Sequence, residues 1–315
     1  MFDVLTITGP IFLLIGLGWA AVRFGVFEPA HTRVLGRFVL MLCLPALLFD
    51  ALSKRRLDEI LFGSYIAAYA LGSLTAMGIG VVWARWRRGA PMSLAALQGM
   101  RMSCPNSGYV GFPLLQQVLG APAAGLLALN MLVENLLLLL LSLALADAEG
   151  HGRARRALIE ALKSLVRNPL VIAIALGLVV AALEWRLPVP LARTISLLSA
   201  ASTPLALIVV GGTLVGMKLE GAYGDVARVA FGKLLLHPLA TLGFVLVLPE
   251  MPPAMTVGVV ISAAMPMIGI YPLLAQKHHH ERFCAAALLA ATVLSFFTIS
   301  AGLWWLRQHP GWLPP

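Results

Sequence analysis

The sequence predicts an all-α polytopic membrane protein with ten transmembrane helices, built from two copies of a five-helix unit. Three observations predict this fold class. Apolar residues make up 60% of the 315 residues, charged residues only 12%, and the mean hydropathy is +0.89, whereas about a quarter of the residues of a soluble domain are charged. Ten apolar stretches are each long enough to cross a bilayer. Four prolines of the first half recur 159 residues later in the second half.

The ten apolar stretches follow one another with only short loops between them, which leaves no room for a soluble domain. The first stretch lacks a basic leading region and a small-residue cleavage signal, so we expect a retained helix and not a signal peptide. We expect the spans at 5–22, 32–51, 61–84, 92–119, 121–146, 166–184, 193–216, 227–248, 254–277 and 283–306.

The recurring prolines indicate an internal duplication. Other residues keep the same spacing, among them Ser103 with Ser262 and Gly99 with Gly258. An odd number of spans per copy places the second copy in the membrane with the opposite orientation, which gives two inverted repeats. We expect a first repeat at 1–146, a cytoplasmic linker at 147–165 and a second repeat at 166–315, with a scaffold domain and a transport domain each drawn from both repeats. The matched prolines are Pro10 with Pro169, Pro29 with Pro188, Pro45 with Pro204, and Pro113 with Pro272.

The net charge of +9 is explained by the way lysines and arginines are distributed between the loops on the two sides of the membrane. If the N-terminus lies outside, the inner loops hold fifteen lysines and arginines and the outer side holds six. This positive-inside bias predicts an inner-membrane protein with both termini outside. Because the basic residues do not gather on one face, we expect no nucleic-acid partner.

Prolines also predict where helices bend. Pro45 and Pro204 fall in the middle of the second span of each repeat, where a proline removes a backbone hydrogen bond and favours a kink. Pro10 and Pro169 are expected in the first turn of their helices, where proline is tolerated.

The fourth span of each repeat, which is the fourth and the ninth of the chain, is expected to be broken. The first carries Pro105, Gly108 and Pro113 within nine residues, and the second carries Pro266 and Pro272 around a glycine. Two prolines with glycine between them do not continue a regular helix. Irregular backbone at membrane depth is tolerated where it lines a cavity, so matched breaks predict two spans that cross at the bilayer midplane around a transport site.

The broken spans suggest what the site binds. Pro113 and Pro272 suit the first position of the second half-helices. The free N–H groups of two such helix starts favour an anion. The carbonyl ends of the first half-helices could equally hold a cation or a proton carrier.

Few polar side chains lie near the breaks. Arg101 could bind a carboxylate or extend to the cytoplasmic face, and Ser103 and Ser262 could contact ligand, bond to their own helix or pack. We predict that the substrate is bound by Arg101, Ser103, Pro105, Asn106, Ser107, Gly108, Ser262, Pro266, Met267, Gly269 and Tyr271.

Other ionisable residues lie deep in the spans and are candidates for ion coupling. Glu134 could carry a proton or pair with Arg101 or Lys233. His237 could titrate or simply pack. The run His278–His280 lacks the ligand spacing of a metal site, so we expect no metal, and the three cysteines are expected to be buried and free.

No enzyme signature is present: the sequence has no H-E-x-x-H, no G-x-S-x-G and no Walker A motif. We therefore expect a transporter, not an enzyme, and no cofactor.

The broken spans resemble the auxin efflux carrier family of secondary transporters. The resemblance rests on the Asn-x-Gly-aromatic-x-Gly-x-Pro pattern of residues 106–113 and on the five-plus-five layout of the whole chain. It implies a scaffold domain, a transport domain and two crossing helices that hold an organic anion. The second crossing, residues 265–272, has no asparagine and looks most like the bacterial malonate-carrier branch.

We therefore expect a secondary carrier of malonate or another dicarboxylate that works by alternating access and is coupled to a proton or sodium gradient, if it is coupled at all. The alternatives are a sodium-coupled symporter of related crossed-helix fold, a membrane-embedded enzyme, and a sensor that binds the anion without moving it. By analogy with carriers of this design, a homodimer is expected.

Overall fold

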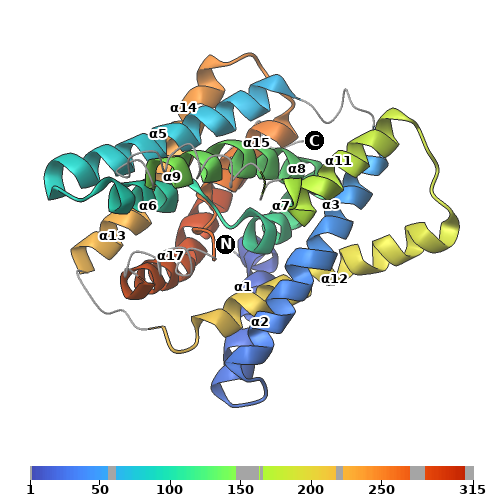
Figure 1. Ribbon diagram of the computed structural model, residues 1–315, viewed down its shortest axis with the longest axis horizontal. Helices are drawn as coiled ribbons and strands as arrows, with labels where there is room; N and C mark the ends of the chain where they lie inside the picture. Colours follow the sequence, from blue (N-terminus) through green and yellow to red (C-terminus); the bar gives the residue numbers. More distant parts are fainter. Residues whose placement is uncertain are drawn as a thin grey trace. The chain divides into compact units, whose positions relative to one another are not determined.

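The computed structural model describes residues 2–55, 62–146, 163, 166–217, 223–269 and 281–308 (Figure 1). Within these ranges every element is a helix, and the β-structure is limited to one isolated bridge. The all-helical class is therefore confirmed. The linker at 147–165, apart from Lys163, and the predicted residues Tyr271, Pro272 and His278–His280 lie outside the described ranges.

Seven helices of the described chain are long and apolar enough to cross a membrane, and each matches a predicted span. The predicted spans at 92–119, 166–184 and 254–277 contain shorter helices: α6 (Met92–Ser103), α11 (Pro169–Ala182) and α15 (Pro253–Ala264). The seven long helices run over Val4–Arg23, Pro29–Ser53, Gly63–Arg88, Ala123–Ala146, Val189–Leu214, Val226–Val247 and Cys284–Leu306.

The described chain forms two compact units, and each draws on both halves of the sequence. Unit 1 consists of residues 1–63, 107–131 and 166–216. Its helices are α1 (Phe2–Arg23), α2 (Pro29–Phe38), η1 (Val39–Cys43), α3 (Leu44–Ser53), η2 (Ser107–Gly111), α7 (Phe112–Leu119), most of α8 (Ala123–Val133), α11 and α12 (Val189–Leu214).

Glycines allow the helices of unit 1 to pack closely. Helix α12 lies against α1, where a side chain on Gly211 would overlap the backbone of Ile15 and one on Gly18 would overlap the backbone of Ile208. Small residues at a helix crossing are typical of membrane proteins, because association there depends on close van der Waals packing.

Unit 2 consists of residues 64–106, 132–165 and 217–315. Helix α5 contacts α14 where Gly72 faces Thr241, and it contacts α6 where Gly80 faces Gly99. The helices of unit 2 are α5 (Gly63–Arg88), α6, η3 (Glu134–Leu138), α9 (Leu139–Ala146), α13 (Tyr223–Phe231), η4 (Gly232–Leu236), α14 (His237–Val247), α15 and α17 (Glu281–Gln308).

The segments η1 to η4 are π-helical, and prolines account for three of them. Segments η1, η2 and η4 each end two residues before a proline, namely Pro45, Pro113 and Pro238. Proline cannot donate to the carbonyl four residues earlier, and its ring clashes with that carbonyl, so the preceding turn widens. Segment η3 has no proline at the equivalent place.

The two first-turn prolines differ in the structure. Pro169 begins α11 behind an Asn168 cap, whose side chain accepts a hydrogen bond from Leu170 N–H at 2.9 Å, as predicted. Pro10 lies inside α1, because that helix already begins at Phe2. The prediction for Pro10 was therefore wrong, and the early apolar residues extend the helix backwards.

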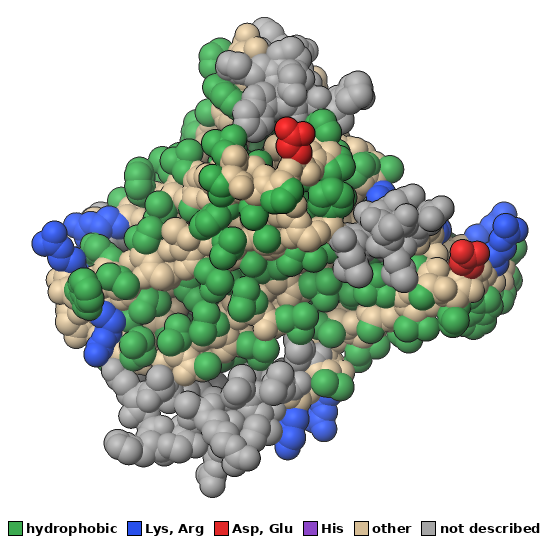
Figure 2. Space-filling view, turned by 90° about the horizontal axis from the view of Figure 1, so that it is seen from above, with side chains coloured by type: hydrophobic (Ala, Val, Ile, Leu, Met, Phe, Trp, Pro, Cys, Tyr) green, Lys and Arg blue, Asp and Glu red, His purple; other side chains and the backbone are tan. Residues whose placement is uncertain are grey.

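The surface is dominated by apolar side chains, as a lipid environment requires. Hydrophobic side chains are spread over the whole described part of the face seen in Figure 2, and lysines and arginines form a few separate groups. Large apolar residues such as Leu13 and Leu197 are both 74% exposed. The three cysteines, Cys43, Cys104 and Cys284, are buried and free, as predicted.

Candidate functional site

Helices α6 and α15 of unit 2 both end at a proline, and for the same reason. A residue before proline is sterically pushed out of the helical region towards an extended conformation. Cys104, before Pro105, has φ −93° and ψ 107°, and Met265, before Pro266, has φ −64° and ψ 151°. Both helices have 12 residues and end two residues before a proline.

The two extended stretches after these helices pair with each other. Asn106 N–H donates to the Pro266 carbonyl at 2.7 Å, and Ile268 N–H donates to the Cys104 carbonyl at 3.1 Å. Pro105 and Met267 thereby form an antiparallel bridge. Segments 162 residues apart in sequence are thus joined backbone to backbone, and Pro105, Pro266 and Met267 are structural parts of this junction.

The Asn106 side chain lies beside this junction. It is only 7% exposed, and it makes no hydrogen bond within the described part of the chain. Gly269 lies opposite, where an added methyl group would be 3.8 Å from Asn106 Nδ2. Because Gly269 is exposed, the asparagine amide lies close to an accessible surface and can donate to or accept from a ligand there.

The helical structure that follows α6 in the predicted span at 92–119 begins earlier than predicted. Helical structure resumes at Ser107 and continues through Gly111, which has φ −64° and ψ −50°, into α7. Pro113 is therefore not the start of the second half-helix. Instead it lies within a continuous helical path and widens the turn before it.

Ser107 and Gly108 belong to unit 1, as does Tyr109. Gly108 packs against Leu44, and the Tyr109 hydroxyl donates to the Gly36 carbonyl at 2.8 Å. The aromatic residue of the 106–113 pattern thus attaches η2 to α2. Ser107 and Gly108 are both buried, and their ligand contacts remain a prediction.

Ser103 and Ser262 are buried and bond to their own helices. Ser103 Oγ lies 3.5 Å from the Met100 carbonyl, and Ser262 Oγ donates to the Gly258 carbonyl at 2.7 Å. Arg101 is completely buried in α6, so its guanidinium does not extend to an exposed end of the helix. A buried arginine at this place keeps a fixed positive charge within unit 2.

The deep acid Glu134 begins η3 and is only 6% exposed. Tyr69 of α5 donates its hydroxyl to Glu134 Oε1 at 2.6 Å, a length typical of a hydrogen bond to a carboxylate. The predicted partners were Arg101 and Lys233, so Tyr69 was missed.

Lys233 and His237 form a second buried polar cluster. Lys233 Nζ lies 2.7 Å from the Ala263 carbonyl oxygen and 2.8 Å from His237 Nδ1. His237 Nε2 lies 2.9 Å from Ser73 Oγ, and its ring lies 6.2 Å from that of Tyr69. Both ring nitrogens of His237 therefore have a hydrogen-bond partner. From the sequence, either titration or simple packing was expected of this residue.

A sequence signal for the missed residues exists. Tyr65, Tyr69 and Ser73 are spaced by four residues in an otherwise apolar helix, so they share one face of α5. All three are completely buried. A polar stripe at this spacing in a transmembrane segment indicates the face that points away from lipid.

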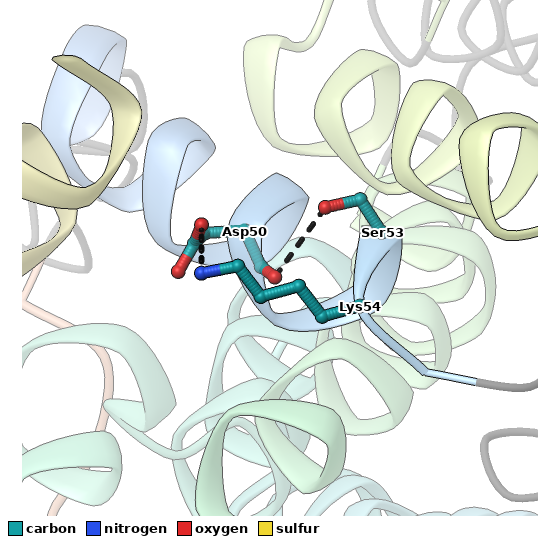
Figure 3. Close-up of polar contacts among 3 residues, drawn as sticks. All are labelled: Asp50, Ser53 and Lys54. Carbon is teal, nitrogen blue, oxygen red and sulfur yellow. Dashed lines mark hydrogen bonds and ion pairs between the residues drawn. The ribbon is translucent and has the colours of Figure 1, made fainter. Parts of the chain in front are cut away.

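Asp50 is the remaining acid of a described span. It forms an ion pair with Lys54 at 2.6 Å, while Ser53 Oγ lies 3.4 Å from the Asp50 carbonyl oxygen (Figure 3). The Lys54 side chain is 62% exposed, so this is a surface pair of little energetic consequence.

Comparison with known proteins gives one family over nearly the whole chain. A family model described as "Membrane transport protein" matches residues 4–303. A protein of Rhizobium meliloti with the name "Putative malonate transporter" is 26% identical over 312 residues, covering 98% of this chain and 97% of the relative. "Uncharacterized transporter YfdV" of Escherichia coli is 24% identical over 94% of each chain. An "Uncharacterized transporter" of Methanothermobacter thermautotrophicus is 27% identical over 93% of this chain and 95% of its own.

Proposed function

Because the chain belongs to the membrane transport protein family, that of the auxin efflux carriers, we propose that it is a secondary carrier of a small organic anion. Its relatives are transporters and not enzymes. A multi-pass carrier of this kind contacts the lipid bilayer and a small substrate. The proposed substrate is malonate or another dicarboxylate, moved across the inner membrane by alternating access.

The proposed architecture has ten spans in two inverted repeats, with the fourth and ninth spans broken and crossing near the bilayer midplane. Support comes from α6 and α15, which have equal length, both end before a proline, and are followed by stretches that pair with each other. In the proposed division, unit 1 is the scaffold and unit 2 is the transport domain. Each unit contains segments from both halves of the sequence, as such domains require.

The observation that carries the proposal is the buried Asn106 amide beside the paired stretches. A polar side chain this deep is normally hydrogen-bonded, and a carboxylate held against the amide N–H₂ would satisfy it. Arg101 would supply positive charge from the same unit. We propose that the remaining predicted residues, namely Ser103, Pro105, Ser107, Gly108, Ser262, Pro266, Met267, Gly269 and Tyr271, shape the site or contact its ligand.

The proposed substrate class follows from the size and the charge of the proposed binding site. Gly269 lies opposite Asn106 and has no side chain. A second asparagine at this place would make the space for the substrate smaller. A compact dicarboxylate suits one amide and one arginine. The name of the Rhizobium meliloti relative supports malonate as the first candidate.

Coupling is proposed to run through the buried ionisable groups. The sequence carries no Walker A motif, so the driving force would be an ion or substrate gradient. Glu134 is the proposed proton carrier, and Lys233 with His237 forms a second buried ionisable cluster in the same unit. We also propose that both termini face outside and that the carrier works as a homodimer.

Ligand binding to purified protein tests the function. We expect malonate, and more weakly malate or succinate, to raise the thermal unfolding midpoint, while citrate and auxin-like acids have smaller effects. Asn106→Ala should abolish this stabilisation and uptake by proteoliposomes. The matched control Asn168→Ala removes only a helix cap, worth about 1 kcal/mol, and should keep both ligand effects.

Two outcomes would overturn the proposal. One is the absence of stabilisation and uptake with every carboxylate tested. The other is binding without exchange of labelled for unlabelled substrate across the vesicle membrane, which would identify a sensor.

A further inference from the structure

The carbonyl end of α15 is in contact with a buried lysine. Helix α15 ends at Ala264, so the carbonyls of its last turn lack the usual partner four residues later. The Ala263 carbonyl oxygen accepts from Lys233 Nζ at 2.7 Å, and Lys233 is completely buried. The ammonium therefore sits where the partial negative charge of the helix end is concentrated.

The contact between the ammonium and His237 indicates which ring nitrogen of His237 carries the proton. A charged lysine has only donors, so His237 Nδ1, at 2.8 Å, must accept. The proton of the neutral imidazole is then on Nε2, which donates to Ser73 Oγ at 2.9 Å. With Lys233 charged, these contacts place the imidazole proton on Nε2 and leave a lone pair of Nδ1 facing the ammonium.

The acceptors around the ammonium are of the kind that can also hold a small monovalent cation. A helix-end carbonyl and an imidazole lone pair both offer electron pairs to one buried point. A cation at this point stabilises acceptors that would otherwise be buried without a partner.

We propose that the Lys233 ammonium fills a monovalent-cation site at the carbonyl end of the broken span, so that this carrier does not use sodium. The inference deepens the proposed function, on which it rests, because it selects between the two coupling ions. Lys233 places the ammonium in this site, which is formed by Ala263, His237 and Ser73. Removal of the lysine should leave the site open to free cations.

Sodium dependence of the unaltered protein is the first test. We expect equal uptake of the carboxylate identified above in sodium, potassium and choline media at matched ionic strength, and equal unfolding midpoints in the three salts. Uptake that rises with sodium, or a higher midpoint in sodium than in both other salts, would overturn the inference.

Removal of the ammonium is the second test. Lys233→Ala should unfold at a lower temperature than the unaltered protein. Sodium or ethylammonium, but not the bulkier choline, should raise its midpoint by about 2 °C at concentrations well above the dissociation constant. Lys54→Ala, which removes an exposed lysine, should show none of these effects.

Lys233→Met covers the case in which Lys233→Ala does not fold, because methionine keeps most of the apolar stem. An identical response of both Lys233 variants and the unaltered protein to every cation would overturn the inference. The midpoints are measured without any carboxylate, so they remain informative even if no carboxylate binds and the carrier function fails.

Discussion

Individual polar residues near the two breaks have different roles because their local partners differ. Ser103 and Ser262 bond to carbonyls of their own helices, which is the ordinary arrangement for serine in an apolar helix. Asn106 lies beyond the end of α6 at Ser103, so it has no carbonyl one turn earlier in a helix to bond to. For this reason we propose its amide as the ligand contact.

A proton role for Glu134 predicts a change in pH dependence. One pH unit across the membrane supplies about 1.4 kcal/mol per proton carried, so substrate accumulation should change about tenfold per unit of imposed gradient. Glu134→Gln keeps an acceptor for the Tyr69 hydroxyl but cannot exchange a proton. Accumulation by this variant in proteoliposomes should not respond to the gradient.

The matched control is Asp50→Asn, which removes an acid paired at the surface. This variant should keep the full response to the pH gradient. If Glu134→Gln also kept it, the carboxylate would have a structural role only.

Among the elements, the ends of α6 and α15 could be predicted from the sequence. The residue at which helical structure begins again after α6 could not. Pro105 and Pro266 act on the residue next to them, so α6 and α15 end where local sterics require. The restart at Ser107 depends on contacts far along the chain, such as Tyr109 with Gly36. Similarly, the contacts of Glu134 with Tyr69 and of His237 with Ser73 join residues more than 60 positions apart, and periodicity does not specify such pairs.

The crossing of α1 and α12 predicts a large cost for one added methyl group. In Gly211→Ala the new Cβ would overlap the Ile15 carbonyl oxygen, which belongs to the backbone and cannot rotate away. Overpacking of this kind costs about 3 kcal/mol. We expect a clearly lower unfolding midpoint in detergent.

Gly16→Ala in α1 is the matched control, because nothing lies within 4 Å of the added Cβ. Alanine there should leave the midpoint unchanged or raise it slightly, since it has a higher helix propensity than glycine. Equal behaviour of the two variants would show that α1 and α12 do not approach this closely.

For the whole molecule, the sequence repeat divides the chain at its midpoint, while the compact units divide it differently. Unit 1 takes the first two spans of each half, and unit 2 takes most of the rest. The repeat is visible in the sequence because prolines keep their spacing. The grouping of helices is not, because it depends on which faces pack together after both halves have been inserted.

The positive-inside distribution predicts the accessibility of two exposed tryptophans. Trp86 lies at the basic end of α5 and is 85% exposed, and Trp185 lies in a loop predicted to be outside and is 60% exposed. A membrane-impermeant maleimide should label Trp185→Cys in intact cells and Trp86→Cys only after permeabilisation. The unaltered chain, whose cysteines are buried, should remain unlabelled, and the reverse labelling pattern would contradict the orientation.

The hydrogen bonds from Asn106 to Pro266 and from Ile268 to Cys104 bear on how such a chain could have arisen. Either half made alone would leave one amide and one carbonyl unsatisfied in an apolar interior, at several kcal/mol for each. An ancestral single unit would have had to insert in both directions and associate as antiparallel pairs. In the inverted-repeat architecture proposed above, fusion of two genes would have made that partnership permanent and left each copy free to diverge.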